Sequence, residues 1–285
     1  MIRSLPSSRR YRWSFNLFIG AYFVLLFAPL VVTMILAFND SMYPSLPWEG
    51  FTFDWFFGSG PEKFGIFNDQ ANLRSLAFSF RVALAVACLS TILGTCAAFL
   101  FEQEDFRFKG ALYFLMIAPL VIPGVILGIS ILMFANTVGI FIEDLTGIYV
   151  KSLVPGFWLV VLGQSSFIST IVALVVSARL KKFDRSLEEA AYNLGANRAE
   201  VLRYVTLPYL RPSILGGAAV AFLMSFENFN TTIFTVGSQA TLPINMYMQV
   251  RDGSTPVINA ISFLLITGTS IFAVANLYLG KKKED

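Results

Sequence analysis

The residues best placed to do chemistry are charged side chains inside long apolar stretches of the sequence. Glu227 follows an apolar run and stands among small polar groups, Ser225, Asn228 and Asn230. An ionised group inside a bilayer costs about 2.5–3.5 kcal/mol on insertion scales, so it usually faces a cavity or an oppositely charged partner. A carboxylate at low dielectric attracts a cationic amine more strongly than one in water. We therefore expect Glu227 to face the path of a cationic solute, with Asn228 or Asn230 as hydrogen-bonding partners.

Arg81 is the second charged side chain inside an apolar stretch, and it leaves a structural role for Glu227 open. It lies seven residues beyond Arg74 in a helical register, about 10 Å deep at ~1.5 Å per residue. Glu227 lies 15 residues beyond Pro212, about 22 Å along a helix. The two charges fall near the same level if their stretches cross the membrane in opposite directions. An Arg81–Glu227 ion pair that never meets a solute would explain both residues equally well.

Several classes of catalytic chemistry have no residues to carry them. The chain contains no histidine, which removes histidine acid–base catalysis, Ser-His-Asp and Cys-His nucleophiles and histidine metal sites. It has no Gly-Lys-Ser/Thr phosphate loop, so we expect it to bind neither ATP nor Mg²⁺, and we expect no other cofactor or metal. A net charge of +3 gives no reason to expect nucleic acid as a partner. A transport protein fits these absences better than an enzyme.

The elements that hold these residues are predicted to be membrane helices. Of the 285 residues, 56% are apolar and only 14% are charged, against about 25% charged in soluble domains. A membrane helix needs about 20 mainly apolar residues. Stretches of this kind occur at 15–38, 76–101, 111–134, 157–176, 214–236 and 257–279. We predict an all-α integral membrane protein with six transmembrane helices, forming one domain over 1–285.

The distribution of basic residues predicts the orientation of these helices. Most of the 21 lysines and arginines fall in the N-terminal tail, in the loops after the second and fourth stretches and in the C-terminal tail. Lysine and arginine are enriched in loops that stay on the cytoplasmic side. Both termini are therefore expected in the cytoplasm.

The loop after the fourth stretch has a regular pattern of its own. Ser186 precedes Glu189 by three residues, and Asn197 precedes Glu200 by three, which is the capping-box pattern of a helix start. Gly195, between them, is a natural left-handed stop. The loop is therefore predicted to contain two short helices.

Two prolines and an apolar face complete the pattern of this loop. Pro208 and Pro212 are expected to end the second short helix, and Pro212 can lie near the start of the fifth span. Small apolar residues recur on one face of the first helix, at helical spacing. They are Leu187, Ala190, Ala191 and Leu194. This face is suited to packing on another protein.

The spacing of Glu189-Ala190-Ala191, Gly195 and Val205-Thr206-Leu207-Pro208 resembles the EAA loop of binding-protein-dependent ABC importer permeases. The resemblance implies the type I permease fold, with a membrane core over 73–280 and a coupling loop over 177–212. It implies that the first short helix docks in a groove of a cytoplasmic ATPase. The residues that it assigns to this coupling are Glu188, Glu189, Ala190, Ala191, Leu194, Gly195 and Ala196.

The same resemblance implies partners and a location. A permease of this class works with a second permease, expected to be a related but different chain, and with two copies of an ATPase that uses ATP and Mg²⁺. A substrate-binding protein outside the membrane delivers the solute. The lipid bilayer is the bacterial cytoplasmic (inner) membrane, and transport proceeds by alternating access driven by closure of the ATPase.

A narrower resemblance, over 223–265, is to the second permease of polyamine importers for putrescine and spermidine. The matching segments are Ser225-Phe226-Glu227-Asn228, Phe234-Thr235-Val236-Gly237, Leu242-Pro243-Ile244 and 255–260. Other small solutes stay open as cargo: an amino-acid derivative, a quaternary amine or an inorganic ion. A secondary transporter working alone would need several carboxylates inside the membrane, and only Glu227 qualifies.

Overall fold

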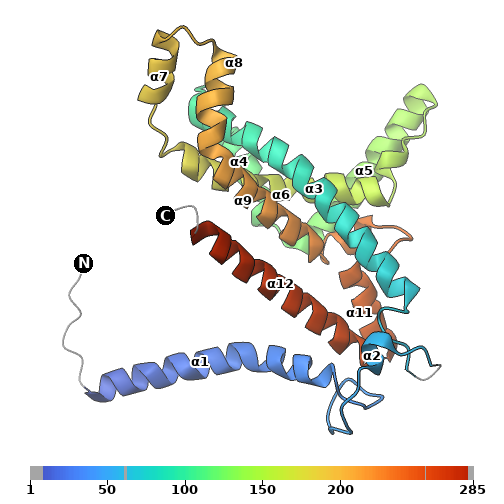
Figure 1. Ribbon diagram of the computed structural model, residues 1–285. Helices are drawn as coiled ribbons and strands as arrows, with labels where there is room; N and C mark the ends of the chain where they lie inside the picture. The colour runs from blue at the N-terminus through green and yellow to red at the C-terminus, as the bar shows by residue number, and fades with distance from the viewer. Residues whose placement is uncertain (1–8, 61–62, 254, 282–285) are drawn as a thin grey trace. The chain divides into compact units, whose positions relative to one another are not determined.

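The part of the chain that the structure describes is mainly helical. The computed structural model describes residues 9–60, 63–253 and 255–281, with side chains up to 271 in the last helix. Figure 1 shows helices joined by loops, and no β-sheet among these residues. In chain order the elements are α1 (Arg9–Leu36), α2 (Asp54–Phe57), α3 (Gln70–Gln103), α4 (Lys109–Ile117), η1 (Ala118–Leu120), α5 (Gly124–Thr146), η2 (Lys151–Leu153), α6 (Phe157–Leu180), α7 (Ser186–Asn193), α8 (Arg198–Val201), η3 (Leu202–Thr206), α9 (Leu207–Phe226), α10 (Thr232–Thr235), α11 (Leu242–Gly253) and α12 (Val257–Lys281).

Five helical segments of the described chain are long and apolar enough to cross a membrane. They are α1, α3, α5, α6 and the continuous run Arg198–Phe226, which contains α8, η3 and α9. The sixth predicted stretch coincides with α12, which is apolar over Val257–Ile271. The helices thus agree with an all-α membrane protein, and the count of six spans stays a prediction.

Two of the predicted spans are interrupted rather than continuous. The stretch expected at 111–134 divides into α4, η1 and α5, because Pro123 is extended (φ −54°, ψ 132°) and α5 starts after it. The stretch expected at 214–236 divides between the end of α9 at Phe226 and the start of α10 at Thr232. At membrane depth, non-helical backbone is tolerated only where it is buried in protein or lines a water-filled cavity. The two breaks are therefore the places to look for a site.

The described chain packs as two compact units. The central unit spans 74–245, and the terminal unit combines 1–73 with 246–285. Each has its own packing, described separately below. The expectation of one permease domain over 1–285 stays a prediction.

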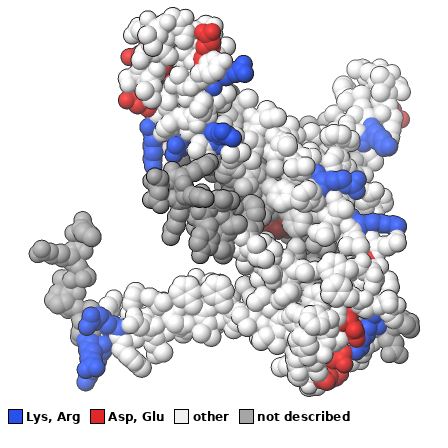
Figure 2. Space-filling model, viewed as in Figure 1, with Lys and Arg blue, Asp and Glu red and all other residues white. Residues whose placement is uncertain are grey.

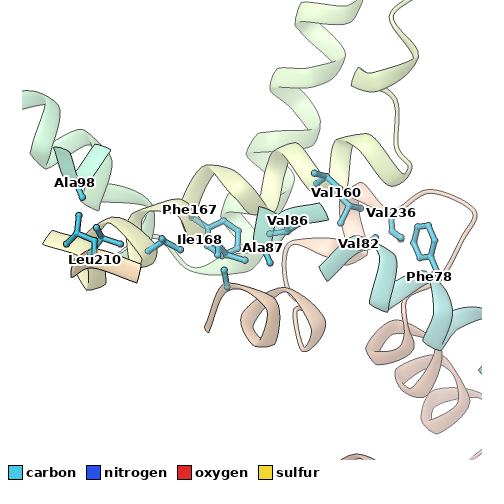
Figure 3. Close-up of a cluster of buried hydrophobic side chains, with 14 of the residues drawn as sticks. Phe78, Val82, Val86, Ala87, Ala98, Val160, Phe167, Ile168, Leu210 and Val236 are labelled. Carbon is cyan, nitrogen blue, oxygen red and sulfur yellow. The ribbon is translucent and has the colours of Figure 1, made fainter. Parts of the chain in front are cut away.

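The core of the central unit is built around α6, which is buried along most of its length. Figure 3 shows apolar side chains of α3, α6 and α9 in one cluster, among them Val86, Ile168 and Leu210. In lipid, helices associate through close packing and hydrogen bonds rather than by escaping water. Because α6 is buried on most sides, its neighbours are positioned by their packing against it.

The terminal unit contains α1, α12 and the loop between α1 and α3. The ring of Phe38 packs against Phe56 and Phe263, with centroids 5.2 and 5.0 Å away. The backbone oxygen of the buried Asn39 accepts a hydrogen bond from the indole N–H of Trp55 at 2.8 Å. The aromatic residues of this loop thus fold onto the ends of α1 and α12. Figure 2 shows basic side chains near the start of α1 and none further along it.

Candidate functional site

The break after α9 is a short segment held by its own side chains. Glu227 is the last residue bonded into α9, its N–H donating to the oxygen of Leu223 at 3.1 Å. Asn228 Oδ1 then accepts hydrogen bonds from Thr231 Oγ1 at 2.5 Å and from Thr232 Oγ1 at 2.9 Å. Asn228 was predicted as a solute contact, and the structure places its carbonyl oxygen inside the turn that leads into α10. Local side-chain bonds of this kind compete with helix continuation.

Glu227 is exposed and has no ion-pair partner in the described part of the chain. Arg81 is also exposed. Its guanidinium lies 5.8 Å from the ring centroid of Phe78, and its Nε donates to the oxygen of Ala77 at 3.4 Å. The Arg81–Glu227 ion pair, the alternative to a solute contact, is therefore not formed. The C-terminal end of a helix carries roughly half a negative charge, so α9 reinforces the attraction of the Glu227 carboxylate for a cation.

The start of α5 lies directly against the break after α9. A Cβ built on Gly124 would lie 2.9 Å from the Cβ of Asn230, and one on Gly128 would lie 2.9 Å from the Cα of Thr231. Glycine is required at both positions because any side chain would meet these atoms. Asn230 is exposed at this junction. Two interrupted helices thus meet next to Glu227, an arrangement that in other transporters builds ion and solute sites.

Gly128→Ala is expected to destabilise the folded protein by about 1–3 kcal/mol, the usual penalty for overpacking. The added methyl group meets the backbone of Thr231, which cannot rotate away as a flexible side chain would. Thermal unfolding of the purified protein in detergent measures the effect. Gly139→Ala, on the same helix, is the control, because its new methyl group would come no closer than 3.8 Å to Leu153. Equal stabilities for the two variants would contradict the close packing of the two breaks.

The sequence patterns did not point to Gln164, which joins α6 to this break. Its side chain is 1% exposed, its Nε2 donates to Thr232 Oγ1 at 2.7 Å, and its Oε1 accepts from Ser225 Oγ at 2.5 Å. The available signal was a full amide inside the apolar stretch 157–176. Buried amides almost always find partners, but the sequence gives no indication of which ones.

The segment 186–206 forms a helical hairpin at one end of the central unit, as Figure 1 shows for α7 and α8. Gly195 adopts φ +90°, which confirms the predicted left-handed stop. The predicted capping box at the start of α8 is also confirmed. Asn197 Oδ1 accepts from the N–H groups of Ala199 and Glu200, and Glu200 Oε2 accepts from the N–H of Asn197 at 2.8 Å.

The predicted cap of α7 is wrong. Ser186 does not cap the helix through its hydroxyl, and the N-cap position falls on Arg185. Asp184 takes over the role, since its Oδ1 accepts from the N–H of Ser186 at 3.0 Å. Hydrogen bonds from the side chain and the N–H of Ser186 lower the pKa of Asp184. A carboxylate two residues earlier is the better acceptor because its charge also suits a helix N-terminus.

The predicted helix end at Pro208 and Pro212 is wrong as well. The chain stays helical from Arg198 to Phe226, and both prolines lie inside this run. The π-turn η3 ends at Thr206, two residues before Pro208, and the N–H of Leu207 bonds five residues back, to the oxygen of Leu202. Proline cannot serve as donor and clashes with the carbonyl four residues earlier. The wider π-turn changes the local hydrogen bonding at this place, so the helix continues.

One face of the hairpin is exposed and the other is anchored. Leu194 is 89% exposed, and Thr206 Oγ1 donates to Glu188 Oε1 at 2.5 Å. Of the residues expected to couple, the exposed ones are Glu189, Ala190, Leu194 and Gly195, and the half-buried ones are Glu188, Ala191 and Ala196. The hairpin thus presents an apolar surface, while the carboxylate of Glu188 is hydrogen-bonded to Thr206 at the start of α9.

The hairpin is also tied to the end of α3. Arg198 Nη2 lies 3.2 Å from Glu104 Oε1, and Arg185 Nη2 donates to the backbone oxygen of Glu102 at 3.2 Å. A hollow of about 680 Å³ separates the two elements, with Tyr192 on one wall. Figure 2 shows acidic and basic side chains together on this projecting end. Movement of the hairpin would therefore act on both α3 and α9.

Residues 90–283 match the family described as "Binding-protein-dependent transport system inner membrane component". The chain belongs to this family. The "Putrescine transport system permease protein PotI" of Escherichia coli (strain K12) is 32% identical over 269 residues, which cover 92% of this chain and 89% of that protein. The "Spermidine/putrescine transport system permease protein PotC" of Haemophilus influenzae is 26% identical over 268 residues, 94% of this chain and 96% of that one.

The fold is similar to that of a chain in a crystal structure of "a bacterial ABC transporter involved in the import of the acidic polysaccharide alginate". The TM-score is 0.67 at 13% identity, with 99% of each chain covered. The all-α permease fold is thereby confirmed. This permease is a subunit of an ABC importer in the inner membrane and not an enzyme, and a partner ATPase hydrolyses the ATP. Because the chain belongs to an ATP-driven class of importers, the alternative of a secondary transporter working alone is excluded.

Proposed function

We propose that this permease carries a polyamine of the putrescine or spermidine type through the membrane, with Glu227 as the cation-binding group. The observation that carries the proposal is the exposed carboxylate at the negative end of α9, which has no ion-pair partner in the described ranges. An ammonium group would supply the missing countercharge. The names of the relatives point to the same class of cargo.

Within this proposal the polar residues of the break have different tasks. Asn230 is exposed and offers its amide to the solute. Asn228 shapes the segment through its bonds to two threonines. Arg81 is exposed on α3 and has no carboxylate partner in the described structure. Its positive charge repels cations from this part of α3.

Coupling is proposed to run through α7. Its exposed apolar face, with Ala190 and the adjoining Leu194, docks on the ATPase, and Glu188 passes the movement to α9 through Thr206. The assembly consists of this chain, a different second permease, two ATPase copies and one external binding protein. Both termini lie in the cytoplasm. ATP and Mg²⁺ bind to the ATPase, and this chain holds no cofactor, metal or nucleic acid.

An uptake assay tests the cargo. The permease is expressed with the partner proteins encoded beside it, in cells that lack their own polyamine importers, and the uptake of radiolabelled putrescine is followed. The expected result is uptake that excess spermidine blocks and that glycine betaine, glutamate and ferric ion leave unchanged. Uptake of betaine, an amino acid or an ion in place of putrescine would keep the importer class and overturn the polyamine assignment.

A further inference from the structure

Gln164 is a full amide buried in the middle of the apolar core of the central unit. It lies on α6 between Val160 and Ile168, two side chains with no exposed surface. Its own side chain is 1% exposed. Burying an amide without partners costs several kcal/mol, so its hydrogen bonds decide what this residue does.

The hydrogen bonds of Gln164 reach both sides of the break after α9. Ser225 Oγ donates to Gln164 Oε1 at 2.5 Å, from the last turn of α9. Gln164 Nε2 donates to Thr232 Oγ1 at 2.7 Å, at the first residue of α10. Thr232 in turn donates to Asn228 Oδ1 at 2.9 Å. These bonds form one continuous chain of donors and acceptors. Ser225 and Thr232, which contribute the hydroxyls, are both buried.

The two residues that Gln164 holds stand on either side of Glu227. Ser225 precedes Glu227 by two positions, and Thr232 follows it by five. Between Phe226 and Thr232 the helix is interrupted, so the position of this segment depends on how its two ends are held. Because α6 is buried in the core of the central unit, Gln164 ties both ends of the segment that contains Glu227 to this core. The position of the carboxylate is thereby set from a neighbouring helix.

We propose that Gln164 is a positioning residue for cation binding: it holds the break after α9 so that the Glu227 carboxylate faces the solute path. The inference rests on the proposed function, because it gives Gln164 a task only if Glu227 binds the cargo. An uninterrupted helix would satisfy its backbone without any side-chain brace. The chain instead maintains a break and a buried amide to brace it, which is a structure that packing alone does not require.

The test uses the assembled importer, with putrescine as the probe. Gln164→Met has a similar volume and can make neither hydrogen bond. It is expected to raise the KM for putrescine uptake about tenfold, with a much smaller change in kcat, since a misplaced carboxylate weakens cation binding. Ser165→Ala is the matched control. It removes a buried hydroxyl from the neighbouring residue, one without a hydrogen-bond partner in the described structure, and is expected to leave the KM unchanged.

A second variant covers the case in which Gln164→Met does not assemble. Ser225→Ala keeps the glutamine and removes only the hydroxyl that donates to it, and it should raise the KM in the same direction. A loss of assembled complex with an unchanged KM in Ser225→Ala would show that the amide serves packing alone and would overturn the inference.

A double-variant cycle separates this inference from the proposed function. In the Glu227→Gln background, Gln164→Met should add no further loss, because the group that it positions is already neutral. If both single variants weaken uptake and their effects multiply in the double variant, Gln164 acts independently of Glu227 and the inference fails, while the proposed function stands. If Glu227→Gln alone leaves the KM and kcat unchanged, the proposed function itself fails and Gln164 has no carboxylate to position.

Discussion

Glu227→Gln is expected to lower the kcat/KM for putrescine uptake about 10- to 100-fold. The exchange keeps the size of the side chain and its place at the end of α9, but it removes the charge that would bind an ammonium group. A hydrogen bond to a charged group contributes about 1.5–3 kcal/mol, which corresponds to this range. The measurement is the initial rate of radiolabelled putrescine uptake into proteoliposomes that contain the assembled importer.

The chain offers a matched control for this charge removal. Glu143 is another exposed carboxylate, in the last turn of α5, and it also has no ion-pair partner among the described residues. Glu143→Gln should leave uptake unchanged. Unchanged uptake in Glu227→Gln, or an equal loss in both variants, would remove Glu227 from the solute path.

Ala190→Lys is expected to abolish binding of the ATPase and, with it, ATP-driven uptake. Ala190 lies exposed on the apolar face of α7. A lysine there would be buried against the ATPase without a countercharge, at a cost of several kcal/mol. The affinity of the ATPase should fall by more than about 100-fold. Binding of the purified ATPase to the permease in detergent gives the value directly.

Ala199→Lys makes the same exchange on the same hairpin. Ala199 is an exposed alanine of α8 and lies outside the apolar face of α7. Its replacement should leave ATPase binding within a few-fold of the starting value. If Ala199→Lys disrupts binding and Ala190→Lys does not, the docking surface lies on α8 and the assignment of α7 is wrong.

Local signals were sufficient for part of the hairpin. The left-handed stop at Gly195 and the capping box of Asn197 depend only on residues within one turn, and both are confirmed. The cap of α7 was misassigned because the Ser186–Glu189 spacing fits a capping box, whereas in the structure the carboxylate of Asp184 accepts from the N–H of Ser186. The continuation through Pro208 was missed because it depends on a π-turn, which has no recognisable residue pattern.

The candidate site depends on contacts that are distant in the sequence. Hydropathy predicted the stretches that hold Glu227 and Gly128, but a window of apolar residues does not reveal a break inside it. The bonds of Gln164 join residues 61 and 68 positions apart, so no local spacing could indicate them. Hydropathy placed Arg81 and Glu227 at a similar depth and left open whether they pair, which only their positions in space decide.

ATP hydrolysis by the purified importer, reconstituted with its external binding protein, tests the central claim most directly. The rate is measured with the binding protein empty and then loaded with putrescine, spermidine, glycine betaine, glutamate or ferric ion. The account predicts that putrescine or spermidine alone stimulates hydrolysis and that Glu227→Gln reduces the uptake that accompanies it. Stimulation only by a non-polyamine ligand, or full putrescine transport by Glu227→Gln, would contradict the account.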